Sequence, residues 1–178
     1  MRPLLESDQL QKAIAQFAQT ITEKYEGHSL MIVAILDGSL LFMADLIRQL
    51  KLPVQIATIH AKSYGQGTIR EDLQIGFAHL PELKGKEVLL LDDIYDTGHT
   101  LSATHSLIKA KEPASLASVV LLRKHGRQEV EYEPDYHLFD INDEFVVGYG
   151  LDYRGDFRNL PYVAIMEPGD VLRQAQLR

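Results

Sequence analysis

Three carboxylates follow one apolar run in the middle of the chain. Val88–Leu91 contains no polar residue and predicts a strand that is buried on both faces. Asp92 and Asp93 lie at its expected end, and Asp96 follows after a short turn. The next residues are Thr97, Gly98, His99 and Thr100. They supply hydroxyls and the first N–H groups of a predicted helix, an arrangement that binds anions. Acids beside such a turn favour a ligand with both hydroxyls and a phosphate, such as a ribose 5-phosphate.

Strands that alternate with helices must position this stretch. Apolar runs at Leu30–Leu36 and Leu116–Leu122 predict two more buried strands, and residues 54–61 alternate as a further strand. Apolar residues at helical spacing predict a first helix for which Ser7 is the N-cap, and two further helices over 40–50 and 100–111. The order predicts a single α/β domain over residues 1–178, with a mainly parallel sheet flanked by helices.

Polar clusters stand at the ends of three predicted strands, at residues 37–39, 92–93 and 123–124. The carboxyl ends of parallel strands meet at one edge of a sheet, where ligands bind. Each cluster alone fits a solvated loop, because charged residues are common after strands. Their convergence therefore carries the prediction of a site.

Composition narrows the classes of partner. The chain has 178 residues, a net charge of −7 and no cysteine. The negative charge argues against nucleic acid, and the missing cysteines exclude disulfides and thiolate metal sites. No apolar run approaches membrane-spanning length, and the first 11 residues lack a signal-peptide pattern. We expect a cytoplasmic protein that binds an anionic ligand together with a divalent cation.

Two other families share parts of this pattern. A response-regulator receiver also has paired acids at a strand end, but near its start, whereas here ~90 residues precede them. A haloacid-dehalogenase-like nucleophile could be read at Asp37, but it needs a second acid where Ile35 stands. Neither the Walker A motif nor the dinucleotide glycine fingerprint is present.

The central stretch resembles the phosphoribosyl-diphosphate (PRPP) binding motif of phosphoribosyltransferases: apolar residues, two acids, two variable residues, then D-T-G-x-T. The third acid, Asp96, is similar to that of the hypoxanthine-guanine phosphoribosyltransferases of purine salvage. The resemblance implies a type I phosphoribosyltransferase fold with a small hood built from the chain ends. It also implies a mobile flap at about residues 62–74, which begins with Ser63 and Tyr64.

A second match, F-V-V-G-Y-G-L-D-Y at residues 145–153 followed by F-R at 157–158, points to the same branch. It implies that Phe145 stacks on the purine and that the backbone of Val146 pairs with the purine edge. Asp152 would lie near the metal ion, and Arg158 would hold pyrophosphate. Lys124 resembles the residue that contacts the 6-oxo group.

The resemblance implies further roles around PRPP. Asp92 and Asp93 would contact the ribose hydroxyls and the surroundings of the metal. Thr97, Gly98, His99 and Thr100 would hold the 5-phosphate. Asp96 would be acceptor or general base at the purine N7. Leu36, Asp37 and Gly38 would bind pyrophosphate, with a non-proline cis peptide between the first two. Relatives often have Lys where this chain has Asp37, and some have Lys in place of His99.

The implied activity is transfer of the phosphoribosyl group of PRPP to N9 of hypoxanthine, and of guanine. It would release pyrophosphate, form IMP or GMP, and require Mg²⁺ held by Asp152, Asp92 and Asp93. A homodimer or homotetramer is expected, with no nucleic-acid or membrane partner. The alternative is a non-catalytic regulator of the same fold that senses PRPP or nucleotides.

Overall fold

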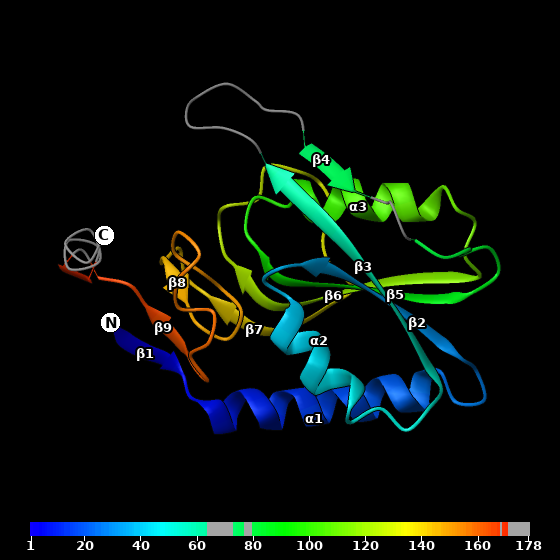
Figure 1. Ribbon diagram of the computed structural model, residues 1–178, viewed down its shortest axis with the longest axis horizontal. Helices are drawn as coiled ribbons and strands as arrows, with labels where there is room; N and C mark the ends of the chain where they lie inside the picture. The colour runs from blue at the N-terminus through cyan, green and yellow to red at the C-terminus, as the bar shows by residue number, and fades with distance from the viewer. Residues whose placement is uncertain (64–72, 77–79, 168, 171–178) are drawn as a thin grey trace.

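A computed structural model describes residues 1–63, 73–76, 80–167 and 169–170 (Figure 1). In these residues the main sheet has six strands in the order β4-β3-β2-β5-β6-β7. The strands are β2 (Leu30–Leu36), β3 (Val54–Ser63), β4 (Leu73–Gly76), β5 (Glu87–Tyr95), β6 (Ser115–Lys124) and β7 (Tyr136–Ile141). β3, β2, β5, β6 and β7 are parallel, and β4 is antiparallel to β3. The predicted α/β class and its mainly parallel sheet are confirmed.

Helices cover both faces of this sheet, as Figure 1 shows. α1 (Ser7–Lys24) and α2 (Leu40–Ile47) pack on one face, where their apolar side chains join those of Ile32 and Leu89 in one core. α3 (His99–Lys109) packs on the other, against Val33 and Leu90. Burial on both faces explains the apolar runs of β2 and of residues 88–91 in β5.

A second, antiparallel sheet is built from the two ends of the chain. It contains β1 (Arg2–Leu5), β9 (Val163–Ile165) and β8 (Val146–Val147), in that order. This sheet corresponds to the predicted hood. Neither β1 nor β7 was predicted, because β1 is short and includes Pro3, and β7 interrupts its apolar residues with His137 and Asp140.

Several element boundaries differ from the predicted ones. β5 continues to Tyr95, so Asp92 and Asp93 lie inside the strand, because its pairing with the long β6 continues past them. α1 is capped by Glu6 rather than by Ser7, and the Glu6 backbone N–H donates to Gln9 Oε1 (2.8 Å). α2 ends at Ile47 rather than at residue 50, because the chain then forms a turn in which the Gln49 N–H donates to Leu46 O.

The predicted flap falls largely outside the described residues. Its two ends belong to a hairpin, because Ser63 of β3 pairs with Leu73 of β4. Tyr64 lies outside the described part of the chain. Among the described residues, no helix combines the length and the apolar character needed to cross a membrane.

Candidate active site

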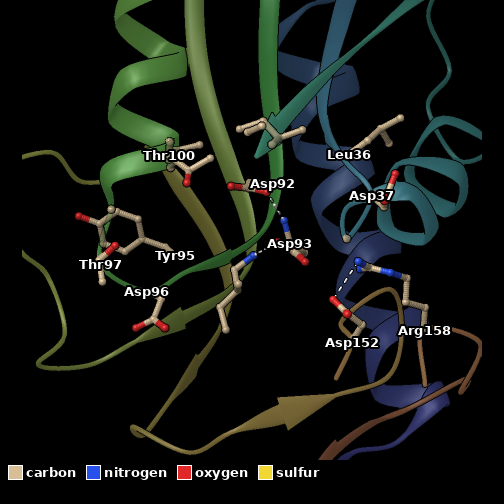
Figure 2. Close-up of a pocket in the computed structure, with 16 residues that line it drawn as sticks. Leu36, Asp37, Asp92, Asp93, Tyr95, Asp96, Thr97, Thr100, Asp152 and Arg158 are labelled. Atoms are coloured by element: carbon tan, nitrogen blue, oxygen red, sulfur yellow. Dashed lines mark hydrogen bonds and ion pairs between the residues drawn. The ribbon is translucent and has the colours of Figure 1, made fainter. Parts of the chain in front are cut away.

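A cavity of about 300 Å³ opens at the carboxyl ends of β2 and β5. Figure 2 shows Asp92 and Asp93 between two groups, with Asp96 and Thr97 on one side and Asp152 and Arg158 on the other. Most of the predicted site residues line this cavity: Leu36, Asp37, Gly38, Asp92, Asp93, Asp96, Thr97, Gly98, Thr100, Asp152 and Arg158. The predicted convergence is therefore observed for the ends of β2 and β5, whereas Lys124 at the end of β6 does not line the cavity. His99, Lys124, Phe145 and Val146 are not among the residues that line it.

Asp92 and Asp93 form the floor of the cavity. Asp92 is buried, and its Oδ1 accepts a hydrogen bond from the Asp93 backbone N–H (3.0 Å). Asp93 Oδ1 accepts from the Ile94 N–H (2.8 Å). Burial raises the pKa of both carboxyl groups, and the neighbouring Asp93 charge raises the pKa of Asp92 further. Hydroxyl donors or a cation bound at this position would reduce the repulsion between the two carboxylates.

The turn after β2 contributes Leu36, Asp37 and Gly38 to the lining of the cavity. The Leu36–Asp37 peptide is cis, as expected. Gly38 lies against Asp93, whose carboxylate occupies the space that a Cβ on Gly38 would need. The Asp37 side chain is 65% exposed, with Oδ1 at 3.8 Å from His60 Nδ1. This geometry favours a backbone role for the turn.

The turn between β5 and α3 is held in place by contacts with Tyr95, Val130 and Glu129. Gly98 has φ +88° and lies against the Tyr95 ring and Val130. The Glu129 N–H donates to Thr97 O (3.0 Å), while the Glu129 carboxylate contacts His99 Nε2 (3.0 Å). The His99 side chain is thereby held away from the cavity, which Thr97 and Thr100 line.

Asp96 belongs to a ring of four charged side chains. Its Oδ2 lies 3.3 Å from Lys124 Nζ, and its Oδ1 lies 3.1 Å from Arg127 Nε. Asp143 contacts the same two cations, at 3.7 Å from Lys124 and 3.5 Å from Arg127. Each cation thus faces two carboxylates. Lys124 is the most buried member, with 9% of its side chain exposed.

Asp152 and Arg158 lie opposite this ring. Arg158 Nη2 contacts Asp152 Oδ1 (2.8 Å), and Asp152 Oδ2 accepts from the Gly155 N–H (2.7 Å). Arg158 also donates to Gly150 O. Within the described residues, no three His, Cys, Asp or Glu side chains gather closely enough to hold a metal ion alone. Mg²⁺ commonly takes one or two carboxylates together with substrate phosphates, and the carboxylates of this cavity fit that pattern.

Phe145 and Val146 differ in exposure although they are adjacent. Phe145 is 52% exposed, and its ring meets the edge of Tyr153 at 5.8 Å between centroids. Val146 is buried in β8. The exposed ring of Phe145 is therefore an available stacking surface.

Arg127 and Asp143 are the charged residues that sequence reasoning left out. Neither residue is among the site residues predicted from the sequence. Arg127 lies in the irregular segment between β6 and β7, and Asp143 lies between β7 and β8. Neither segment has a periodicity that predicts a direction for a side chain. Only the fold brings them to Asp96.

The turn at 36–38 and the segment that carries Asp152 meet at two glycines. A Cβ on Gly150 would overlap Gly38 O, and Gly150 has φ +100°. We expect Gly150→Ala to lower the free energy of unfolding by roughly 2–5 kcal/mol, from the positive φ and the overlap together. Thermal unfolding measures the loss, at roughly 2–4 °C per kcal/mol.

Gly155→Ala is the matched control, because Gly155 also has a positive φ (+87°) but nothing within 4 Å of a Cβ. It should show only the smaller backbone cost. Equal melting temperatures for the two variants would contradict the close approach.

Comparisons with known proteins agree with this geometry. Residues 4–154 match the phosphoribosyl transferase domain family. A hypoxanthine phosphoribosyltransferase of Haemophilus influenzae is 42% identical over 164 residues, which are 90% of this chain and 92% of that protein. That of Salmonella typhimurium is 40% identical over 158 residues, covering 87% and 89%.

Solved structures show the same similarity. The hypoxanthine phosphoribosyltransferase of Staphylococcus aureus has a TM-score of 0.90 at 36% identity, with 95% of this chain and 92% of that one covered. The enzyme of Trypanosoma cruzi in complex with its product IMP has a TM-score of 0.88 at 31% identity, with 95% of each chain covered.

Proposed function

We propose that this chain, which belongs to the phosphoribosyltransferase family, is a hypoxanthine phosphoribosyltransferase of purine salvage. It transfers the phosphoribosyl group of PRPP to N9 of hypoxanthine, and of guanine, and releases pyrophosphate. The observation that carries the proposal is one cavity that joins the paired acids, the turn at 97–100 and the Asp152–Arg158 pair. We further propose that residues 1–178 act as one domain.

The two ends of the cavity suit the two charged parts of PRPP. We assign the 5-phosphate to the hydroxyls of Thr97 and Thr100 and to the backbone N–H groups of residues 97–100, His99 included, at the start of α3. Asp92 and Asp93 would accept hydrogen bonds from the ribose hydroxyls. The pyrophosphate would lie against the backbone of residues 36–38, and Arg158 would donate to it.

Mg²⁺ fits the carboxylate-rich end of this cavity, where Asp152 would hold it with Asp92 and Asp93 nearby. When bound, it would neutralise charge on the departing pyrophosphate. Arg158 adds a positive charge from the protein at the same end of the cavity. Its contact with Asp152 sets its position before substrate arrives. The protein groups therefore stabilise the leaving group as the bond from the ribose carbon to oxygen breaks.

The other end of the site suits the purine. We propose that Phe145 stacks on the base, that the backbone of Val146 pairs with its edge, and that Lys124 donates to the 6-oxo oxygen. Asp96 would accept the proton at N7 as N9 bonds to the ribose carbon. Arg127 and Asp143 complete the ion pairs of Lys124 and Asp96.

A PRPP consumption assay tests the function. We expect wild-type protein to consume PRPP only when hypoxanthine and Mg²⁺ are both supplied. Binding of PRPP without consumption would favour the non-catalytic regulator, which no feature of the described residues supports. The chain shows no surplus of positive charge for nucleic acid.

We also propose that the protein works in the cytoplasm as a homodimer or homotetramer. The exposed apolar side chains of Leu40 on α2 and Ile56 on β3 support a subunit contact. Sedimentation velocity at micromolar protein concentration tests the assembly, and a monomer at every concentration would contradict it.

Asp37→Ala tests the backbone role of the turn. Two anions in one site repel, so removal of this exposed carboxylate should leave PRPP affinity unchanged or up to about fivefold tighter. Calorimetric titration with PRPP and Mg²⁺ measures the affinity. Asp8→Ala, an exposed carboxylate in the first turn of α1, controls for the change in net charge. A large loss of affinity with fold and assembly intact would show that the Asp37 carboxylate assists binding.

A further inference from the structure

The pyrophosphate end of the site is assembled from two separate parts of the fold. The turn at 36–38 follows β2 of the six-stranded sheet, whereas the segment that carries Asp152 and Arg158 follows β8 of the hood. Figure 2 shows Arg158 and Asp152 facing the turn that carries Asp37. The distance between these two parts must be fixed for both to contact one pyrophosphate.

A partly buried hydrogen bond joins the same two parts outside the lining of the cavity. Tyr149 Oη donates to Asp45 Oδ2 (2.5 Å), and these residues are 104 positions apart in the sequence. Asp45 lies on α2, which begins at Leu40, directly after the turn. Tyr149 is the residue before Gly150, whose backbone lies against Gly38. The link therefore connects the element that follows the turn with the segment that faces it.

The surroundings of the Asp45 carboxylate keep it charged, so that it can accept the hydrogen bond from Tyr149. Only 15% of its side chain is exposed. Its Oδ2 also accepts from Gln11 Nε2 of α1 (2.5 Å), and its Oδ1 contacts Arg48. Burial alone would raise the pKa of Asp45, but the hydrogen bonds from Tyr149, Gln11 and Arg48 outweigh it and lower the pKa. Burial and the contact with Asp45 raise the pKa of Tyr149, so the hydroxyl stays a donor.

Backbone hydrogen bonds couple the position of Tyr149 to that of Arg158. Tyr149 N–H donates to Leu160 O (2.9 Å), and Gly150 N–H donates to Arg158 O (3.0 Å). The Arg158 side chain returns a hydrogen bond to Gly150 O. Arg158 is thus fastened at both its backbone and its guanidinium to the residue after Tyr149. Displacement of Tyr149 would displace Arg158 relative to Gly38.

We propose that Asp45 and Tyr149 are a positioning pair that sets the distance between the 36–38 turn and the Asp152–Arg158 segment, and thereby the affinity for the diphosphate group of PRPP. The inference rests on the proposed function. Neither residue is among those that line the cavity, so the pair acts through Gly38 and Arg158. Among the described residues, the Asp45–Tyr149 hydrogen bond involves neither Lys124 nor Phe145, and we expect the purine end to be unaffected.

Tyr149→Phe tests the pair, because it removes only the hydroxyl that donates to Asp45. A hydrogen bond to a charged acceptor corresponds to about tenfold or more in an equilibrium, so we expect the Kd of PRPP and of Mg-pyrophosphate to rise about tenfold. The KM of hypoxanthine should stay within about twofold. Calorimetric titration gives the two Kd values independently of turnover. Asp45→Asn should show the same pattern, and the double variant should be no weaker than the weaker single variant.

Tyr136→Phe is the matched control. Its hydroxyl also bonds a charged partner on a helix, Lys24 Nζ of α1 (2.8 Å), but at β7 and away from the cavity. It should leave both Kd values unchanged.

The positioning role is refuted by unchanged diphosphate affinity in Tyr149→Phe, by losses that add in the double variant, or by an equal rise in the KM of hypoxanthine. If Tyr149→Phe does not fold, Asp45→Asn answers the same question. The absence of nucleotide formation by the wild-type protein would instead refute the proposed function.

Discussion

Asp96→Asn is expected to lower turnover by about 10²–10⁴-fold while PRPP binding stays near that of the wild type. The reason is that the amide keeps the size of the carboxylate but cannot accept a proton at N7, and general acid–base catalysis typically contributes by that factor. Both oxygens of Asp96 already contact cations, Lys124 at 3.3 Å and Arg127 at 3.1 Å, so its carboxylate is supported before the base arrives. Steady-state turnover and calorimetric PRPP binding measure the two effects separately.

Asp143→Asn is the matched control for that variant. Asp143 makes the same kind of contact with the same two cations but does not line the cavity. The same change from carboxylate to amide at Asp143 should therefore cost much less turnover. Near-normal turnover of Asp96→Asn, or equal losses in the two variants, would mean that the proposed role of Asp96 is wrong.

Lys124→Ala is expected to reduce efficiency with hypoxanthine sharply and to narrow its advantage over adenine. An ammonium group only donates hydrogen bonds, so it suits a 6-oxo acceptor, whereas adenine presents an amino donor at that position. A site built around one hydrogen-bonding group can reject the analogue that lacks its partner by about 10⁴–10⁵. Lys124 has 9% of its side chain exposed, which makes an unpaired contact costly. Values of kcat/KM for hypoxanthine and adenine measure the preference.

Arg127→Ala supplies the comparison. Arg127 contacts the same two carboxylates as Lys124, but 44% of its side chain is exposed and we assign it no contact with the base. Its loss should leave the ratio between the two bases unchanged. If Lys124→Ala also leaves that ratio unchanged, the choice of base depends on another group.

The parts of the site that lie on regular strands could be predicted from the sequence. Apolar runs fix β2 and β5, and the parallel order brings the residues after them to one edge, so Gly38, Asp92 and Asp93 were expected to converge. Hydrophobic periodicity does not predict the cis peptide between Leu36 and Asp37 or the exposure of Phe145. The resemblance to known phosphoribosyltransferases supplied the first and the stacking role of the second.

Contacts made by irregular segments could not be predicted in this way. The link between Asp45 and Tyr149 joins residues 104 positions apart, and the Tyr149 backbone has φ +50°, which no propensity anticipates. Arg127 reaches Asp96 from a segment without helix or strand. A pattern predicts which face of an element is buried, but it does not specify the direction of a side chain in a loop.

The most direct measurement is a single reaction that contains wild-type protein, PRPP, Mg²⁺ and equal concentrations of hypoxanthine, guanine and adenine. Separation of the nucleotides by chromatography, together with a pyrophosphate assay, gives the product of each base. A 6-oxopurine phosphoribosyltransferase should form IMP and GMP with one pyrophosphate released per nucleotide, and AMP at no more than about 10⁻⁴ of the IMP formed. AMP in amounts comparable to IMP, or PRPP that remains intact in the presence of all three bases, would contradict it.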